Sequence, residues 1–185
     1  DPKDATTLIA QIRELIQEDY PKPILGICLG NQILALAAGA DTYKLRYGHR
    51  GINQPVQDLL TRRCFVTSQN HGYAVRDVSL PRGWEPWFVN LNDGTNEGIR
   101  CQSRPYSSIQ FHPEVMHTQN GSEIIRNFVI DIAGCKGDWT MAAYKDEAIA
   151  KIREEVGNEK VICGLSGGVD SSVAAVLIHE AIGDE

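Results

Sequence analysis

The chain has 185 residues, of which 42% are hydrophobic and 23% are charged, and its formal net charge is −6. This length is enough for one full domain and part of a second, and the composition is typical of a globular protein. The acidic balance provides no general basic face, so we expect no nucleic acid partner. No apolar run is long enough to span a membrane, so we expect no membrane partner either.

The five cysteines are widely spaced and odd in number. Their spacing fits neither a disulfide framework nor a paired set of metal ligands, and no secretory signal opens the sequence. We therefore expect a protein of the reducing cytoplasm with no metal site. The cysteines are Cys28, Cys64, Cys101, Cys135 and Cys163.

The first forty residues predict a helix, a strand and a second helix. Apolar residues at helical spacing indicate a helix over residues 5–19, which Pro21 ends. The apolar run at 22–28 predicts a buried strand, and residues 31–38 predict a helix that Gly39 closes. This order of helix, strand and helix predicts a parallel α/β architecture.

The pattern changes from about Gly48 to Ile109, where short strand-like runs alternate with turns such as residues 92–94. A helix near residues 122–132 closes this part by Gly134, which gives a first domain over residues 1–134. The expected strands cover residues 64–67, 87–89, 98–100 and 107–111.

Residues 135–157 read as a linker followed by a connecting helix at about 141–156. A strand at 160–165 and a helix at 171–182 are expected next. Residues 158–185 thus form a single strand–loop–helix unit, which cannot bury a core of its own.

Residues 23–30 carry the most informative pattern, a short apolar strand that turns sharply into a helix with Cys28 at the apex. Gly26 and Gly30 flank this cysteine two residues away on each side, which is the spacing of a nucleophile elbow. Such a turn strains the backbone, so the flanking residues must lack bulk, and the helix N-terminus stabilises a thiolate. The pattern predicts a nucleophile at Cys28. The alternative is a small buried cysteine in an α/β core.

His112 and Glu114 supply the two groups that a cysteine nucleophile needs, a base for its proton and a partner that orients the base. They directly follow the strand expected at 107–111, and residues i and i+2 of an extended segment face the same way. Glu114 can therefore hold the imidazole of His112 from one side. The alternative is a strand-end histidine beside a solvated glutamate.

A second motif, residues 166–172, places two glycines between the last expected strand and helix. Backbone N–H groups of such a loop approach an anion closely, and the helix N-terminus adds partial positive charge. The loop lacks the Gly-Lys-Ser/Thr ending of a Walker loop. It is either an anion-binding loop or a purely structural turn.

With these motifs the chain resembles the class I glutamine amidotransferases, which use a Cys-His-Glu triad. Over residues 1–111 the likeness is closest to the small, glutamine-hydrolysing subunit of carbamoyl phosphate synthetase. The resemblance implies a flavodoxin-like α/β fold with a mostly parallel sheet and a nucleophile elbow. The stretches that carry it are residues 26–32, 42–51, 67–73 and 92–98.

The resemblance also implies roles in catalysis. Cys28 would attack the side-chain amide of L-glutamine, giving a γ-glutamyl thioester and ammonia. His112 would act as the general base and then as the acid, with Glu114 orienting it. The backbone N–H of Leu29 would donate to the oxyanion.

The same resemblance implies a pocket for glutamine. The residues that would line it are Gln32, Asn70, Gly72 and Tyr73. Without the resemblance, residues 70–72 would be predicted as a turn, with His71 at the surface. Asn31 stands where many relatives carry histidine, which is tolerable because that residue is not in the triad.

The family precedes this region with two or three strands and a Gly-rich loop that ends in Gly-Asp-Pro, whereas this sequence opens at Asp1 and Pro2. The resemblance therefore implies an N-terminally truncated domain that lacks a second oxyanion donor. Loss of one such donor typically costs about 10²–10³-fold in rate, so we expect reduced activity.

From about Gln110 onwards the resemblance changes to GMP synthetase, which joins a class I amidotransferase to an ATP pyrophosphatase. The stretches that carry it are residues 111–115, 117–118, 136–141 and 161–180. It implies vestigial contacts with the pyrophosphate of ATP or its Mg²⁺ by Ser166, Gly167, Gly168, Asp170 and Ser171. ATP and Mg²⁺ would matter only in an intact synthetase, and a glutaminase needs no cofactor.

The change of resemblance near residues 107–114 predicts a chimeric or artificial sequence. The expected function is glutamine hydrolysis, with the ammonia passed to a synthetase domain or subunit of nucleotide biosynthesis, by the GMP or the carbamoyl phosphate route. The alternative is a non-catalytic glutamine-binding or docking module with an incomplete oxyanion pocket. A third hypothesis, an unrelated thiol hydrolase, is disfavoured because residues 69–73 fit glutamine recognition.

Overall fold

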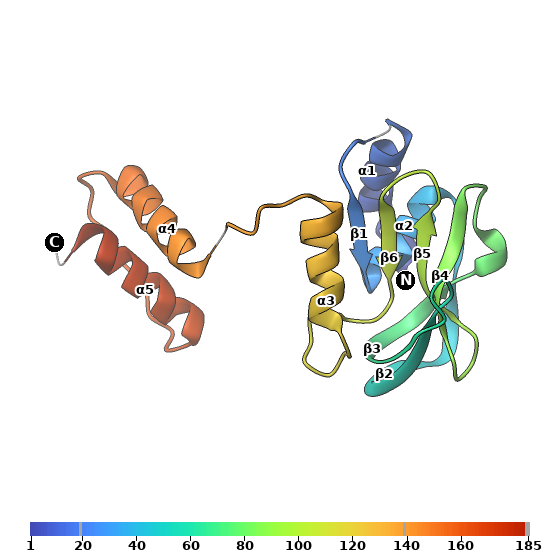
Figure 1. The fold of residues 1–185 in the computed structure, drawn as a ribbon. Helices are drawn as coiled ribbons and strands as arrows, with labels where there is room; N and C mark the ends of the chain where they lie inside the picture. Colours follow the sequence, from blue (N-terminus) through green and yellow to red (C-terminus); the bar gives the residue numbers. More distant parts are fainter. Residues whose placement is uncertain (19, 139, 184–185) are drawn as a thin grey trace. The chain divides into compact units, whose positions relative to one another are not determined.

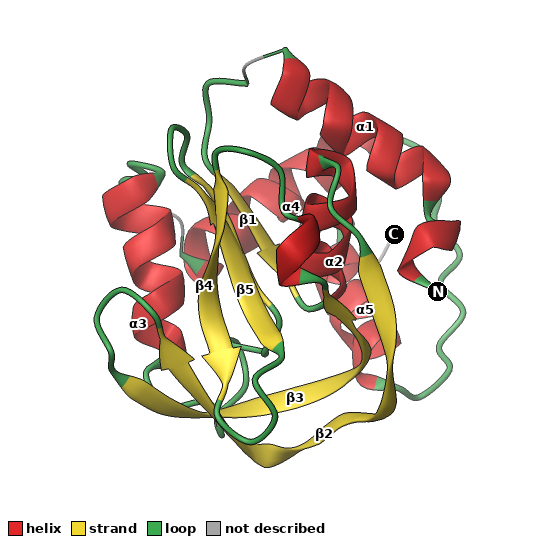
Figure 2. Cartoon of the chain, turned by 90° about the vertical axis from the view of Figure 1, so that its right-hand side faces the viewer, coloured by secondary structure: helices red, strands yellow, loops and turns green. Residues whose placement is uncertain are grey.

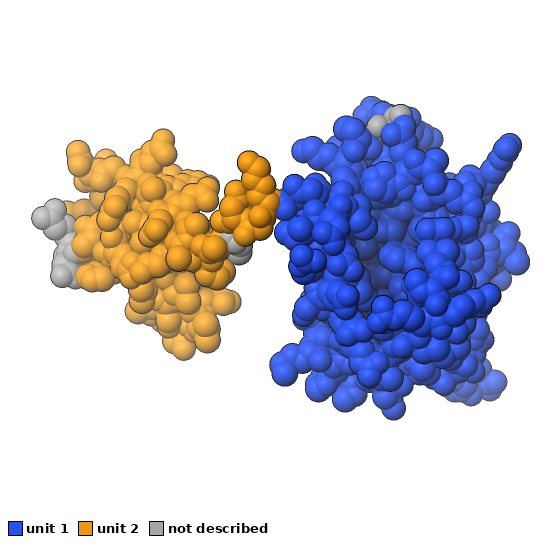
Figure 3. All heavy atoms as spheres, viewed as in Figure 1, with its two compact units in different colours: residues 1–135 blue, residues 136–185 orange. Residues whose placement is uncertain are grey.

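The structure is a computed structural model that describes residues 1–18, 20–138 and 140–183. These residues form two compact units, Asp1–Cys135 and Lys136–Glu185 (Figure 3). Each unit is described by itself below. In the described part of the chain, no helix is both long and apolar enough to cross a bilayer.

The first unit is built around a six-stranded sheet with the order β1-β6-β5-β4-β2-β3 (Figure 1). Strands β2 and β3 are much longer than the rest, and they curl away from the other strands at one end of the sheet (Figure 2). The strands are β1 (Ile24–Ile27), β2 (Thr42–Asp58), β3 (Cys64–Val75), β4 (Trp84–Asn90), β5 (Asn96–Cys101) and β6 (Tyr106–Ile109).

The sheet is mixed rather than mostly parallel, and this part of the expectation is wrong. Strand β1 pairs with β6 in parallel, whereas the other pairs of the described sheet are antiparallel. The physical reason is the connections: strands β2 to β6 follow one another through short loops, which favour antiparallel pairing, whereas a parallel pair needs a long crossover. The α/β class and the elbow between a strand and a helix are confirmed.

Helices cover both faces of this sheet (Figure 2). Helices α1 (Thr6–Gln17) and α2 (Leu29–Ala38) pack together on one face, where Ile9 contacts Ile33 and Leu36. On the other face lie α3 (Gly121–Arg126) and the π-helix η3 (Asn127–Ile132). Two short 3₁₀ helices, η1 (Pro2–Asp4) and η2 (Asp77–Ser79), complete the unit. The predicted helices 5–19, 31–38 and 122–132 thus exist with shifted ends, and residue 19 lies outside the described residues.

The strand β6 and the two residues after it separate an apolar face from a polar one. Ile109 and Phe111 are fully buried in a cluster with Phe88, against which Ile124 of α3 packs. Ser108 and Gln110 are also fully buried, but their side chains bond to residues of α2. Because successive side chains of an extended segment point to opposite faces, this strand presents polar groups next to the elbow.

The second unit contains two helices, α4 (Met141–Val156) and α5 (Val169–Ile182), close to the predicted bounds. An ion pair joins Lys145 to Glu180, and the guanidinium of Arg153 donates to the carbonyl of Ala181. The strand expected at 160–165 is wrong: these residues lie in neither a helix nor a strand. A strand needs a neighbour to satisfy its backbone N–H and C=O groups, and the described part of this unit offers none.

Candidate active site

The backbone of Cys28 is strained, as a nucleophile elbow requires. This residue has φ 52° and ψ −103°, and it lies between the end of β1 and the first residue of α2. Its N–H donates to the carbonyl of Ile109 at 2.9 Å, and its carbonyl accepts from the N–H of Asn31 at 3.1 Å. A positive φ at a residue with a side chain is rare, and it persists only where the surroundings enforce it.

Only one of the two flanking glycines is required by the packing. A Cβ on Gly26 would lie 2.5 Å from the carbonyl oxygen of Gly30, whereas a Cβ on Gly30 would meet nothing within 4 Å. The expectation that both flanking residues must lack bulk is therefore correct for Gly26 and wrong for Gly30. The asymmetry arises because the chain of α2 crosses directly above β1 at Gly26.

The thiol of Cys28 is half-buried, and its environment favours the neutral form. Burial raises the pKa of Cys28, the backbone N–H of Leu29 lowers it, and the charge of Glu114 raises it again. Burial outweighs the stabilisation that the start of α2 gives to a thiolate. The expected thiolate at the helix N-terminus is therefore not favoured in this state, and the thiol needs a base.

His112 and Glu114 are in contact, as their spacing predicts. The imidazole Nδ1 lies 2.7 Å from Oε1 of Glu114, and since a carboxylate only accepts, Nδ1 donates. The backbone fixes the position of the histidine: its N–H donates to the carbonyl of Ser68, and its carbonyl accepts from the hydroxyl of Thr118. This arrangement leaves Nε2 as the atom able to take a proton. Within the described residues, no hydrogen bond joins His112 to the thiol of Cys28.

Gln110 is a site residue that the sequence reasoning missed. Its Nε2 approaches the sulfur of Cys28 at 3.7 Å, and its Oε1 accepts from Nδ2 of Asn31 at 2.9 Å and from Nε2 of Gln32 at 3.1 Å. Asn31 in turn accepts from the hydroxyl of Ser108 at 2.7 Å. An amide inside an otherwise apolar strand end, two residues before His112, was the signal that could have identified it.

The residues expected to bind glutamine lie on α2 and β3. Gln32 is buried, and its Nε2 donates to the carbonyl of Tyr73 at 3.0 Å as well as to Gln110, so its two amide hydrogens are engaged inside the protein. The side chain of Asn70 is exposed and Gly72 is half-buried. The structure thus brings Gln32 and Tyr73 together beside the elbow, whereas Asn70 and Gly72 have no described side-chain contact with Cys28.

His71 is buried rather than at the surface, so the prediction made without the resemblance is wrong. Its Nδ1 lies 2.8 Å from the carbonyl of Tyr73, the same carbonyl that accepts from Gln32. The residue lies within β3, directly opposite His49 of β2. Residues 70–72 are therefore part of a long strand and do not form a turn.

The glycine-rich loop belongs to the second unit. The hydroxyls of Ser171 and Ser172 donate to the carbonyl of Gly168, and the hydroxyl of Ser166 lies 3.1 Å from that of Ser171. No side chain caps the start of α5, and Gly167 has φ 82°. Asp170 lies in the first turn of the helix. The loop therefore leaves helix N–H groups free to meet an anion.

Comparison with known proteins identifies the family. The profile of the family described as Glutamine amidotransferase class-I matches residues 1–132. The chain belongs to the class I glutamine amidotransferases. Residues 141–185 match the profile described as NAD synthase, which bears out the resemblance of the second unit to an ATP pyrophosphatase segment.

The relatives of this amidotransferase domain occur in several larger proteins. The chain is 46% identical over 149 residues to the multifunctional protein CAD of Squalus acanthias, covering 80% of this chain and 6% of that protein. It is 51% identical over 132 residues to the arginine-specific small chain of carbamoyl phosphate synthase from Emericella nidulans, covering 71% and 28%. It is 41% identical over 182 residues to the glutamine-hydrolysing GMP synthase of Bartonella henselae, covering 93% and 34%. The chain thus spans about a third or less of the length of these relatives.

A solved structure supports the same assignment. The amidotransferase fold is similar to that of a GMP synthase protein from Thermoplasma acidophilum, with a TM-score of 0.62 and 27% identity, covering 79% of this chain and 70% of that one. The resemblances to both families are confirmed. Since the Bartonella GMP synthase aligns with both units, their order occurs within one natural protein. A chimeric origin stays a prediction.

Proposed function

We propose that this domain hydrolyses L-glutamine to L-glutamate and ammonia, with Cys28 as the nucleophile. The observation that carries the proposal is the positive φ of Cys28 at the junction of β1 and α2. A purely structural cysteine has no need of a backbone conformation that costs about 1–3 kcal/mol. The hydrogen-bonded pair of His112 and Glu114 on the neighbouring strand end supplies the base and its orienting partner.

The proposed reaction passes through a thioester. The sulfur of Cys28 attacks the side-chain carbonyl carbon of glutamine, forming a C–S bond, while Nε2 of His112 accepts the thiol proton. The C–N bond then breaks, and His112 gives that proton to the leaving nitrogen, which departs as ammonia. Water, deprotonated by His112, breaks the C–S bond, giving glutamate and restoring the thiol.

The developing negative charge needs a donor near the sulfur. The N–H of Leu29 is directed at the thiol, since it is the strongest influence that lowers the pKa of Cys28. We assign this N–H to the oxyanion. A glutaminase of this kind needs no metal and no cofactor.

The test measures ammonia release from glutamine by the full chain. We expect Cys28→Ala to abolish release, whereas Cys135→Ala, which changes an exposed cysteine, leaves it intact. His112→Asn should lower kcat by a factor of about 10² or more, because it removes the general base. Equal release by Cys28→Ala and the unchanged chain would exclude Cys28 as the nucleophile.

A specific observation favours the second candidate, a non-catalytic glutamine-binding module. Burial raises the pKa of Cys28, and in the described residues no hydrogen bond links its thiol to His112. A glutamine analogue that carries a chloroketone distinguishes the two functions. A glutaminase is alkylated at Cys28 faster than by simple iodoacetamide, and excess glutamine protects it. A binding module holds glutamine without being alkylated.

The ammonia is proposed to serve an ATP-dependent synthetase domain or subunit. The GMP route is favoured because the Bartonella GMP synthase aligns with 93% of the chain, including both units. The carbamoyl phosphate route is the second candidate, because the small chain from Emericella is 51% identical over 132 residues. Supplying each type of synthetase subunit with its substrates and measuring which one stimulates glutamine hydrolysis decides between them.

The second unit fits a pyrophosphate group only in part. The uncapped start of α5 and the flexible backbone of Gly167 and Gly168 suit an anion, and ATP with Mg²⁺ would supply the activating group there. Ser166, Ser171 and the backbone of the loop would hold the phosphates, and Asp170 would face the cation. Residues 160–165 form no strand, so the described part of the unit has no wall for an adenosine.

A further inference from the structure

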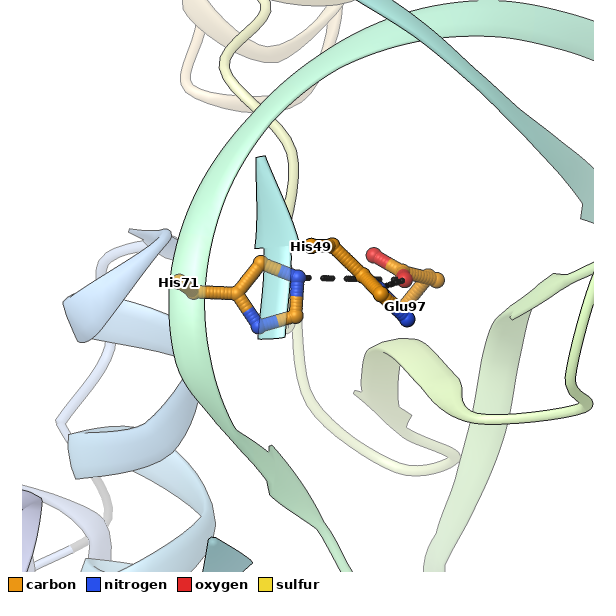
Figure 4. Close-up of side chains that lie close together, drawn as sticks. All are labelled: His49, His71 and Glu97. Atoms are coloured by element: carbon orange, nitrogen blue, oxygen red, sulfur yellow. Dashed lines mark hydrogen bonds and ion pairs between the residues drawn. The ribbon is translucent and has the colours of Figure 1, made fainter. Parts of the chain in front are cut away.

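A buried cluster of two histidines and a glutamate lies outside the proposed catalytic residues (Figure 4). His49, His71 and Glu97 come from β2, β3 and β5, and their ligand atoms all lie within 4.8 Å of one another. Glu97 is completely buried. The bulge in β2 between Lys44 and His49 turns the imidazole of His49 inward, opposite His71.

The proton on His71 can be assigned from its contacts. Its Nδ1 lies 2.8 Å from the carbonyl of Tyr73, which only accepts, so Nδ1 carries a hydrogen. Burial lowers the pKa of His71, which favours a single proton on the ring. Its Nε2 therefore carries a lone pair that is directed into the cluster.

That lone pair faces an oxygen that is also an acceptor. Nε2 of His71 lies 3.1 Å from Oε1 of Gln69. The orientation of this amide is fixed by its other end: Nε2 of Gln69 donates to the hydroxyl of Thr67, which itself donates to the carbonyl of Gln54. Two acceptors thus face each other inside the protein. In addition, Oε2 of Glu97 is buried and has no hydrogen-bond partner among the described residues.

A cation at the centre of this cluster resolves both conflicts. The prospective ligand atoms are Nδ1 of His49, Nε2 of His71 and Oε1 of Gln69 and Glu97. Nδ1 of His49 lies 3.0 Å from each oxygen, and Nε2 of His71 lies 3.1 Å from Gln69 and 3.9 Å from Glu97. Ligands 2.0–2.1 Å from a tetrahedral zinc ion are separated by about 3.3 Å.

We propose that His49, His71, Glu97 and Gln69 form a structural site for a divalent transition metal ion of the zinc type. Two imidazoles, one carboxylate and one amide oxygen make a nitrogen- and oxygen-rich donor set that suits zinc. The second shell is also present, because the carbonyl of Tyr73 fixes the ring of His71 and Nδ2 of Asn90 donates to Glu97 at 3.1 Å. With four protein ligands the ion keeps no open position, so its role is to hold β2, β3 and β5 together.

The competing occupant is a proton. Hydrogen bonding to Glu97 raises the pKa of His49 to about 9, and its Nε2 lies 2.9 Å from the partly exposed Asp93. The imidazolium of His49 can therefore supply the positive charge, and a metal ion must replace its Nδ1 proton. Asp93 continues to accept from Nε2 in the metal-bound state, and it marks the side from which an ion enters.

The test uses the full chain, stripped with EDTA and titrated with Co²⁺ at mildly alkaline pH. We expect one Co²⁺ per chain, with visible d–d bands of a tetrahedral ion and without the near-ultraviolet band of a thiolate ligand. Zn²⁺ should displace the cobalt and raise the melting temperature. Glu97→Gln keeps the shape of the side chain but removes its charge, and it should weaken binding by about 10–100-fold or more. His117→Asn, which changes an exposed histidine outside the cluster, should bind normally.

A readout that needs no variant accompanies the titration. Nitrogen-15 spectra of the Zn²⁺-loaded chain should show Nδ1 of His49 and Nε2 of His71 in the range of metal-bound imidazole nitrogens. The proposal is overturned if His49 stays doubly protonated in excess Zn²⁺, if the cobalt spectrum shows cysteine ligation, or if Glu97→Gln binds as tightly as the unchanged chain. These outcomes are independent of glutamine hydrolysis.

Discussion

At the scale of single residues, the elbow depends on how closely β1 and α2 approach each other. The carbonyl of Ile109 and the N–H of Asn31 hold both sides of the Cys28 peptide, so the strained conformation is imposed by its neighbours. The same closeness leaves no room for a Cβ at Gly26. Burial of the thiol follows from this geometry, and it explains why the pKa of Cys28 is raised although a helix begins beside it.

Replacing the two flanking glycines should have opposite effects. In Gly26→Ala the new methyl group meets the carbonyl of Gly30, so we expect a loss of about 1–3 kcal/mol or more in the free energy of unfolding. In Gly30→Ala the methyl group meets open space within a helix, where alanine is favoured over glycine by about 1 kcal/mol. Urea unfolding followed by circular dichroism measures both. Similar midpoints for the two variants would contradict the asymmetry.

At the scale of elements, periodic patterns predicted the helices and some of the strands. Helices α1, α2, α4 and α5 lie within a few residues of the expected ranges because their apolar residues recur at helical spacing. The long strand β2 was not predicted as a strand, because Gly48, Gly51 and Pro55 interrupt the alternation. Two register shifts in its pairing with β3 absorb these residues, and such bulges cannot be read from one strand alone.

The same limit applies to the candidate site. The contact between His112 and Glu114 was predictable because both residues lie on one extended segment. Gln110 and the cluster of His49, His71 and Glu97 depend on which strands become neighbours, and the sequence does not state the strand order. The expectation of no metal site came from cysteine spacing, which gives no information on histidines brought together by pairing.

The polar link between β6 and α2 should be a stabilising element. In Gln110→Leu the buried Nδ2 of Asn31 loses its acceptor, whereas Nε2 of Gln32 keeps the carbonyl of Tyr73. One buried donor left without a partner costs about 1–3 kcal/mol, and we expect a loss of this size. Adding Asn31→Leu removes the orphaned donor, so the double variant should be more stable than the sum of the two single changes indicates. Strict additivity in urea unfolding would show that the link is not energetically coupled.

At the scale of the whole molecule, the two units differ in how much they bury. The first unit has three clusters of buried apolar residues on both faces of its sheet. In the described part of the second unit, the buried residues are Ile149 and Ala181, and large apolar side chains such as Met141, Val173 and Val176 are exposed. Because apolar burial is the main favourable term in folding, the two units cannot have the same stability.

Hydrogen exchange on the intact chain should resolve this difference. Amides in the middle of α4 and α5 are expected to exchange through local unfolding, with protection at least 10²-fold lower than that of α2 and β6, whose backbone lies in the core. An Ile149→Ala variant should lower protection in α4 and α5 further without changing α2, since Ile149 belongs to the second unit alone. Equal protection in both units would mean that the pair of helices is stabilised as strongly as the sheet. In that case the exposed apolar face of α5 would have to be covered in solution, and self-association measured by sedimentation would reveal what covers it.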